Sequence, residues 1–172
     1  RIQTFPSDRL KLEYWIVNGW QSYGMFNEAP GLGMQVLWRP MGAEADTTWL
    51  TDRSGLEIGF TGVNAVLRDY ARLGRMMANG GRFEGRQLVP ESWIASMTRP
   101  AFAAAKTGQA FGYGYQTWIH PANDGSFALF GVRGQYIFIE PKRQLVMVNT
   151  AVRTGARDPG NASSFALWGA LV

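Results

Sequence analysis

A chain of 172 residues has the length of one ordinary domain, and a hydrophobic fraction of 46% supplies enough apolar surface for a folded core. The absence of cysteine excludes disulfides, thiolate metal sites and a cysteine nucleophile, and a single histidine excludes clustered histidine metal sites. The net charge of +4 comes mainly from arginine, and no apolar stretch approaches the roughly 18 residues that a membrane helix needs.

Residues 1–31 are partly apolar and aromatic, but neither the period of a strand nor that of a helix runs through them. The first residue is Arg1 instead of methionine, and nothing near it has the charged, apolar and cleavable parts of a targeting signal. We therefore expect further sequence upstream of Arg1, and the cellular location stays open.

The middle of the chain predicts two helices. After a loop over residues 42–54, apolar side chains recur at steps of three and four over residues 66–79, and two glycines then supply a stop. Residues 82–89 have the composition of a short polar connection, and Pro90 suits the first position of a second helix that ends near residue 97. We expect the stripe of the first helix to face the core: Leu67, Tyr70, Leu73, Met76 and Met77.

The last third predicts an antiparallel sheet. Residues 112–119 have the pattern of one strand, residues 127–139 alternate aromatic and aliphatic side chains, and residues 145–150 follow a turn as the second arm of a hairpin. Residues 163–172 are apolar, and we expect them to form a helix that lies on the sheet. The fold class is therefore mixed α/β, of the α+β type, with an antiparallel sheet flanked by helices.

The single histidine, His120, stands just before Pro121 at the end of a predicted strand. Residues 120–125 have the composition of a turn. This position favours a loop histidine over a catalytic one, although a Ser-His-Asp triad would have to use it.

Three arginines, Arg68, Arg72 and Arg75, share one face of the first predicted helix. Acidic residues are mixed into the segment, and no aromatic residues line up beside the arginines as a stacking platform. A solvated helix face is favoured over a nucleic-acid-binding surface, which steeply salt-dependent affinity would reveal.

Seven segments keep a characteristic order and spacing within residues 34–155. They are 38–46 (WRPMGAEAD), 61–65 (TGVNA), 67–75 (LRDYARLGR), 79–82 (NGGR), 87–93 (QLVPESW), 111–118 (FGYGYQTW) and 134–141 (GQYIFIEP). Together they resemble the serine β-lactamase-related hydrolases, a family of class C β-lactamases, D-alanyl-D-alanine carboxypeptidases, family VIII esterases and 6-aminohexanoate-dimer hydrolases. The branch of nylon-oligomer hydrolases and esterases is more similar than the true β-lactamases.

The resemblance implies a β-lactamase/transpeptidase-like fold without metal or cofactor. Residues 1–172 would be a single partial domain, the C-terminal portion of such a hydrolase, with residues 1–31 poorly matched. In the family a serine of an S-x-x-K motif is acylated, and the lysine and a tyrosine of a Y-x-N or Y-x-S motif handle protons, because a hydroxyl at its ordinary pKa is a weak nucleophile. A third motif, K-T-G or H-x-G on an edge strand, supplies a backbone N–H to the oxyanion hole.

The chain departs from this pattern at each motif. No serine has lysine three positions later, and no tyrosine has Asn or Ser two positions later, although Tyr14 and Tyr23 lie in the corresponding region. Residues 106–108 spell K-T-G, but they precede the 112–118 strand, where the family has a loop, so Lys106 is interpreted as a surface lysine. The third motif corresponds by position to residues 132–134.

By position, the resemblance assigns the oxyanion N–H to Gln135, the lining of the substrate cleft to Val132, Arg133 and Gly134, and the opposite wall to Asn64. Arg133 would either select an anionic end of the substrate or point to solvent. Without the resemblance, Gly131 and Gly134 would mark a strand that needs a close approach of two backbones, and Asn64 would form a local hydrogen bond.

The leading hypothesis is therefore the C-terminal half of a serine hydrolase that acts on small amide, ester or lactam substrates and needs the missing N-terminal half. The alternative is a non-catalytic remnant or binding module of the same fold. An S-x-x-K motif encoded upstream of Arg1 would distinguish the two.

Overall fold

The computed structural model describes residues 2–7, 9–17, 31–38, 41–58, 61–107, 110–121, 124–155 and 161–172. The chain divides into two compact units, residues 1–43 and residues 44–172. Within the described ranges, no helix is long and apolar enough to span a lipid bilayer.

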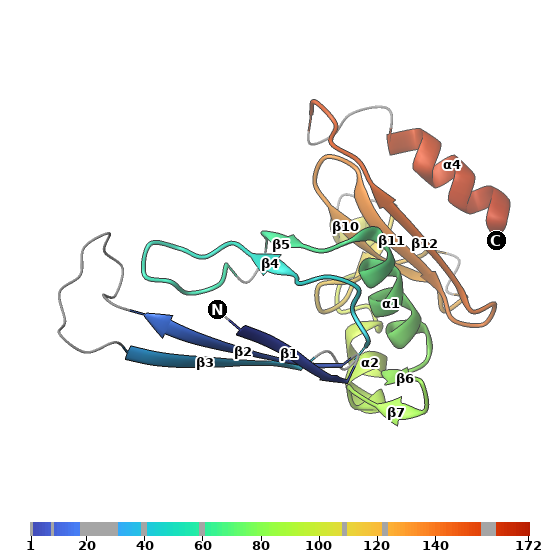
Figure 1. The fold of residues 1–172 in the computed structure, drawn as a ribbon. Helices are drawn as coiled ribbons and strands as arrows, with labels where there is room; N and C mark the ends of the chain where they lie inside the picture. Colours follow the sequence, from blue (N-terminus) through green and yellow to red (C-terminus); the bar gives the residue numbers. More distant parts are fainter. Residues whose placement is uncertain are drawn as a thin grey trace. The chain divides into compact units, whose positions relative to one another are not determined.

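The first unit is a three-stranded antiparallel sheet (Figure 1). Its strands, in the order β1-β2-β3, are β1 (Ile2–Ser7), β2 (Leu10–Val17) and β3 (Gly31–Trp38). Every residue of β1 is exposed, including Ile2 and Phe5. Because neither face of β1 is buried, its sequence lacks the alternation of a half-buried strand, which explains why the strand period was missing there.

The second unit contains the first predicted helix, α1 (Leu67–Ala78). Two glycines end it: Gly80 has φ 60° and Gly81 has φ 87°, the left-handed conformation that glycine adopts without strain. A Cβ on Gly81 would lie 2.1 Å from the Val89 carbonyl oxygen, so this position also has no room for a side chain. The predicted helix and its stop are confirmed.

The buried face of α1 differs in part from the predicted stripe. Met76 and Met77 are buried as predicted, but Leu67 is 51% exposed, so its assignment to the core is wrong. The helix presents Gly74 to the sheet, where an added Cβ would lie 2.6 Å from Val146 Cγ1. Leu67 precedes Gly74 by almost two full turns, so it shares the helix face of Gly74, but it stands in the first turn of the helix, about 10 Å along the axis from the close approach.

Short elements lie on either side of α1. β4 (Thr48–Trp49) pairs with β5 (Val63–Asn64) before the helix, and β6 (Arg82–Phe83) pairs with β7 (Arg86–Gln87) after it. The stretch predicted as a plain polar connection is thus a small hairpin. Pro90 takes the N-cap position of α2 (Glu91–Met97), so the helix begins one residue after the predicted start, and α3 (Ala104–Thr107) follows.

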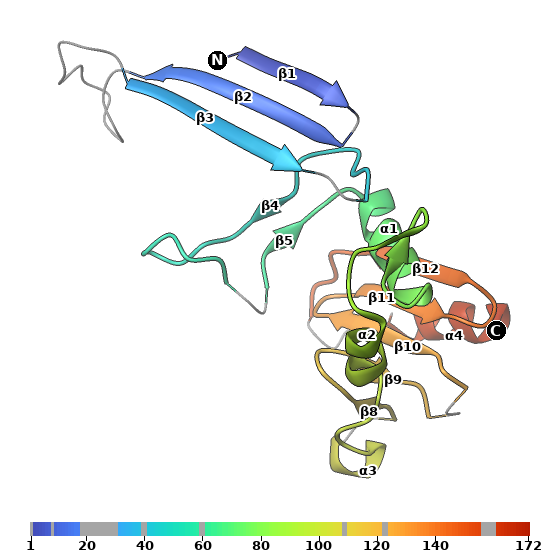
Figure 2. The ribbon, with the colours of Figure 1, turned by 90° about the horizontal axis from the view of Figure 1, so that it is seen from below.

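A five-stranded antiparallel sheet forms the rest of the unit (Figures 1 and 2). Its order is β12-β11-β10-β9-β8, with β8 (Gly112–Tyr113), β9 (Trp118–Ile119), β10 (Phe127–Gly131), β11 (Gln135–Glu140) and β12 (Leu145–Thr150). The predicted antiparallel neighbours are confirmed, with one correction: residues 112–119 form two strands. The Gly114 N–H donates to the Thr117 carbonyl at 2.9 Å, which closes a tight turn inside that segment.

Helices α1 and α4 (Asn161–Leu171) cover opposite faces of this sheet (Figure 1). On the α1 face, Gly74 lies against Val146 and Ile137. On the α4 face, Trp168 stacks on Phe138 with ring centroids 5.3 Å apart. That face carries a buried hydrophobic cluster of Ala128, Tyr136, Phe138 and Trp168, with Phe130, Met147 and Phe165 partly buried against it. The predicted C-terminal helix on the sheet is confirmed.

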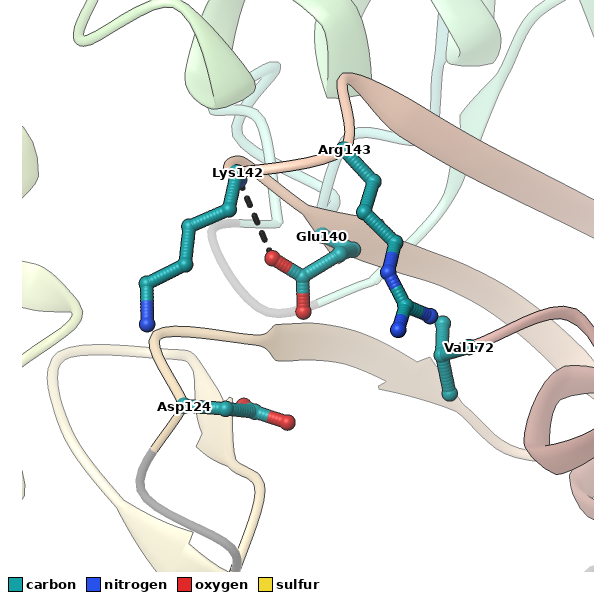
Figure 3. Close-up of a pocket in the computed structure, with 5 residues that line it drawn as sticks. All are labelled: Asp124, Glu140, Lys142, Arg143 and Val172. Carbon is teal, nitrogen blue, oxygen red and sulfur yellow. Dashed lines mark hydrogen bonds between the residues drawn. The ribbon is translucent and has the colours of Figure 1, made fainter.

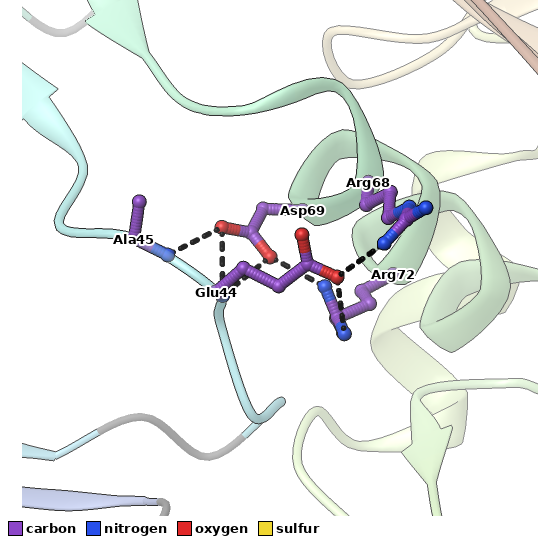
Figure 4. A network of polar contacts seen from close by, with 5 residues as sticks. All are labelled: Glu44, Ala45, Arg68, Asp69 and Arg72. Carbon is purple, nitrogen blue, oxygen red and sulfur yellow. Dashed lines mark hydrogen bonds and ion pairs between the residues drawn. The ribbon is translucent and has the colours of Figure 1, made fainter.

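The Asp69 side chain on α1 forms hydrogen bonds with the start of the second unit (Figure 4). Its buried carboxylate accepts the Glu44 N–H at 3.0 and 3.1 Å and the Ala45 N–H at 3.4 Å. Arg72 Nη1 donates to Asp69 Oδ1 at 2.8 Å, while Arg72 Nη2 and Arg68 Nη1 lie 3.1 and 3.5 Å from Glu44 Oε1. The network holds the chain that leads into β4 against the helix.

Candidate functional site

The residues assigned by resemblance to the oxyanion hole form the turn between β10 and β11. Gly131 pairs with Gln135, so Val132, Arg133 and Gly134 close the hairpin. Arg133 has φ 63° and Gly134 has φ 83°. A positive φ is uncommon for a residue such as arginine, so the turn needs support from its surroundings.

The chain that follows β12 supplies part of this support. Arg133 Nη1 donates to the carbonyl oxygens of Arg153 and Thr154 at 3.0 and 2.9 Å. The Arg133 carbonyl in turn accepts the Arg153 N–H at 3.2 Å. Arg133 is exposed, which agrees with the predicted alternative in which it points to solvent. Its guanidinium, however, donates hydrogen bonds to backbone carbonyls instead of extending freely into solvent.

Gly134 is held from two sides. An added Cβ would lie 2.5 Å from Arg153 Nε and 2.9 Å from its Cδ, so the group that approaches this glycine is the Arg153 side chain and not a second backbone, as was predicted. A close backbone approach is found at Gly131, where an added Cβ would lie 3.1 Å from the Gln135 carbonyl oxygen. The Gly134 carbonyl accepts Asn149 Nδ2 at 2.7 Å, and the same amide lies 3.2 Å from Ser164 Oγ on α4. Asn149 was missed by the sequence analysis, although an amide that directly follows the four apolar residues 145–148 is a signal that could have found it.

Gln135 begins β11, which has β10 on one side and β12 on the other. The prediction that residues 132–135 lie on an edge strand is therefore wrong. The reason is that β12 returns beside β11 in regular register, pairing Thr150 with Gln135 and Leu145 with Glu140. The turn lies at one end of the sheet, where Gln135 is exposed and Val132 is 66% exposed. If Gln135 supplies the oxyanion N–H, that N–H has to point into the cleft and not into a ladder hydrogen bond, and this stays a prediction.

Asn64 stands on β5, where it pairs with Thr48 of β4. Its side-chain amide donates to the Gly62 carbonyl at 3.0 Å, two residues back. This is the local hydrogen bond that the alternative reading expected. Its assignment to the opposite wall of a cleft stays a prediction.

His120 does not complete a Ser-His-Asp triad with its neighbours. The Asp124 carboxylate lies between the Ser126 hydroxyl and the His120 imidazole. Its Oδ1 accepts the Ser126 hydroxyl at 2.5 Å, and its Oδ2 lies 3.9 Å from His120 Nδ1. In a triad the imidazole has to lie between the hydroxyl and the carboxylate so that it can take the hydroxyl proton. The order here is that of a polar turn, which agrees with the interpretation of His120 as a loop residue.

The remaining candidates from the sequence are Lys106 of the K-T-G match and the two tyrosines Tyr14 and Tyr23. Lys106 is exposed on α3, a four-residue helix where a loop was predicted, and Gly108 lies outside the described residues. Tyr14 is exposed on β2, and Tyr23 lies outside the described residues. In the part of the chain that the structure describes, no three His, Asp or Glu side chains are placed to hold a metal ion.

A cavity of about 200 Å³ lies at the other end of the sheet (Figure 3). Asp124, Glu140, Lys142, Arg143 and Val172 line it. Buried Glu140 accepts the Lys142 N–H at 3.0 Å. Burial works to raise the pKa of Asp124, but the hydrogen bonds from Ser126 and the nearby His120 outweigh it and lower that pKa. Because Glu140 ends β11 and Gln135 begins it, roughly 17 Å of strand separates this cavity from the turn.

Comparisons of the sequence and of the structure with known proteins identify relatives of this chain. No family model matches the chain. A curated 6-aminohexanoate-dimer hydrolase from Paenarthrobacter ureafaciens is 30% identical over 119 residues, which cover 65% of this chain and 30% of that protein. A structure from Bacillus anthracis, solved as a candidate 6-aminohexanoate-dimer hydrolase, superposes with a TM-score of 0.67 at 27% identity.

That superposition covers 78% of this chain and 35% of the Bacillus protein. A candidate β-lactamase from Bacteroides dorei DSM 17855 gives a weaker match, with a TM-score of 0.41 and 17% identity over 62% of this chain and 40% of that one. The chain thus spans about a third of the length of the two 6-aminohexanoate-dimer hydrolase relatives that it matches.

Proposed function

Because the chain belongs to the serine β-lactamase-related hydrolases, we propose that it supplies the oxyanion side of a serine hydrolase active site. The bonds that it helps to cleave are amides, esters or lactams of small molecules. The nucleophilic serine and its lysine come from sequence upstream of Arg1, since no serine of the chain has lysine three positions later.

The turn of residues 132–135 is the observation that carries the proposal. Its two left-handed residues are held by hydrogen bonds to Arg153 and from Asn149, which orient the backbone next to Gln135 without a substrate. An oxyanion hole requires such preorganised N–H groups, because they stabilise charge at no reorganisation cost during the reaction. The exposure of Val132 and Gln135 leaves the turn open to a ligand.

The chemistry is an acyl transfer in two steps. The serine gives its proton to the base and its oxygen attacks the carbonyl carbon, whose oxygen becomes an oxyanion that accepts the Gln135 N–H. The C–N or C–O bond then breaks, and the leaving amine or alcohol takes that proton. Water next attacks the acyl-serine, the same N–H stabilises the second oxyanion, and the acyl–serine bond breaks to release the acid and restore the serine hydroxyl. The chain's part in both steps is electrostatic, a term that typically contributes about 10²–10³ in kcat per donor.

A linear amide is the favoured substrate class. This preference rests on two relatives named 6-aminohexanoate-dimer hydrolase, one found by sequence similarity and one by structural similarity. The alternative, a non-catalytic remnant or binding module, rests on the absence of the S-x-x-K and Y-x-N patterns from this chain.

The test uses a polypeptide in which the chain is joined to the protein sequence encoded upstream of Arg1. Gln135→Ala should keep most of the amide and ester hydrolysis, because the donor belongs to the backbone. Gln135→Pro removes the N–H and should lower kcat by about 10²–10³, or about 2.7–4 kcal/mol. Circular dichroism checks that both variants fold. Equal kcat in the two folded variants, or an upstream sequence without S-x-x-K, would favour the non-catalytic alternative.

A further inference from the structure

The peptide group between Gly134 and Gln135 joins the proposed oxyanion donor to a carbonyl that the structure holds in place. A peptide group is planar, so the Gly134 carbonyl and the Gln135 N–H move as one unit. None of the described peptide bonds is cis, and in a trans peptide the C=O and the N–H point in opposite directions. A contact that holds the Gly134 carbonyl therefore also sets the direction of the Gln135 N–H.

The Asn149 side chain makes such a contact. Its Nδ2 donates to the Gly134 carbonyl oxygen at 2.7 Å. A carbonyl oxygen accepts hydrogen bonds and does not donate them, so the amide has to present its nitrogen and not its oxygen. The same Nδ2 lies 3.2 Å from Ser164 Oγ, and one amide nitrogen has two N–H groups to give. The side chain is thus held between the turn and α4.

The place of Asn149 in the sheet indicates that its amide has a specific role. It follows the apolar residues 145–148 of β12, and asparagine is depleted in strands. Across the ladder it pairs with Tyr136, which is buried in the hydrophobic cluster beneath α4. A polar side chain beside such a cluster destabilises the fold unless it is hydrogen-bonded. The bonds to Gly134 and Ser164 meet that requirement.

The other printed contacts of the turn act on the preceding peptide group. The Arg133 carbonyl accepts the Arg153 N–H, and this carbonyl belongs to the peptide between Arg133 and Gly134. The next peptide can still rotate about the Gly134 Cα, because glycine has no side chain to restrict its φ and ψ. Asn149 contacts that next peptide directly. Without Asn149, the Gln135 N–H would lose this restraint on its direction.

We propose that Asn149 is a positioning residue that directs the Gln135 N–H at the oxyanion, an inference that rests on the proposed function. The Asn149 amide approaches the peptide from the side of β12 and α4, so the N–H points away from them. The hydrogen bond to the carbonyl also polarises the peptide group, which makes its N–H a stronger donor. Asn149 touches no reacting atom and acts through this one peptide.

The test uses two substitutions in the polypeptide that is joined to the sequence encoded upstream of Arg1. Asn149→Asp keeps the size of the side chain but turns the donor into an acceptor, and Asn149→Ala removes the group. Loss of a whole oxyanion donor lowers kcat by about 10²–10³, so we expect misdirection of the donor to lower it by about 10- to 100-fold. KM should change little, because the oxyanion exists only in the transition state and the intermediate.

Met147→Ala is the matched control. Met147 stands two residues before Asn149 on the same face of β12 and packs against the cluster beneath α4. Its truncation should lower Tm and leave kcat unchanged, because it does not touch the peptide between Gly134 and Gln135. A fall in kcat that follows Tm equally in Met147→Ala and Asn149→Ala would overturn the proposal.

A double-mutant cycle tests whether Asn149 acts through the Gln135 N–H. Once Gln135→Pro has removed that N–H, Asn149→Ala should lower kcat no further, whereas two independent effects would multiply and overturn the proposal. Unchanged kcat in the Asn149 variants, beside a loss in Gln135→Pro, would overturn this inference alone. Full kcat in Gln135→Pro would overturn the proposed function together with it. Circular dichroism checks folding, and if one Asn149 variant fails to fold, the other decides.

Discussion

Replacing Asp69 by alanine should destabilise the second unit by about 2–4 kcal/mol. The substitution removes the shared acceptor of the Glu44 and Ala45 N–H groups and the partner of Arg72. A part-buried donor left without an acceptor costs about 1–3 kcal/mol. The Arg72 contact adds less than about 1 kcal/mol, because the Arg72 side chain is 27% exposed and solvent screens it.

Urea unfolding followed by circular dichroism measures this change, provided that the slope with denaturant stays constant. Asp69→Asn keeps one acceptor oxygen and should fall between the wild type and Asp69→Ala. Glu44→Gln is the control: it touches only the exposed ion pairs with Arg68 and Arg72 and should cost under about 1 kcal/mol. A value for Asp69→Ala within about 0.5 kcal/mol of the wild type would refute the reasoning, because surface substitutions outside networks have effects of that size.

Two further predictions concern the glycine of the turn and the carboxylate at the cavity. Gly134→Ala should lower the free energy of unfolding by about 1–3 kcal/mol more than Gly125→Ala. Both glycines have positive φ, but only at Gly134 would the added Cβ meet the Arg153 side chain. Equal losses would show that the Arg153 side chain moves aside without cost. Ser126→Ala should raise the folded-state pKa of Asp124, seen in a carboxylate NMR titration, because it removes the hydroxyl donor. Since that pKa is lowered in the folded state, its stabilising effect is present above the unfolded pKa and is lost as pH falls through the folded one; an unchanged titration of Asp124 would contradict this.

The sheet and its helices could be predicted because their residues face a core on a regular period. Residues 127–130 and 136–139 are apolar and buried or half-buried on two strands, and the two glycines after Asn79 end α1 by their positive φ. Leu67 was misplaced because the period gives a stripe but not where the helix approaches the sheet most closely. That choice is made by Gly74, whose missing side chain admits Val146 from a distant strand.

The site was predictable only as a position in the chain. The resemblance located residues 132–135, but sequence neighbours cannot show that Asn149 and Arg153 hold the turn, because those contacts span 15 to 20 residues. The edge-strand prediction failed for a related reason: the pairing of β12 with β11 removes the edge and depends on where the chain returns.

We propose that this chain supplies the oxyanion side of a serine hydrolase but not its nucleophile. Reaction with a fluorophosphonate, followed by intact-mass analysis and peptide mapping, tests it most directly. We predict no adduct on the chain alone, and one adduct on a serine upstream of Arg1 when the chain is joined to its upstream sequence. A stoichiometric adduct on a serine within residues 1–172 of the isolated chain would contradict the account.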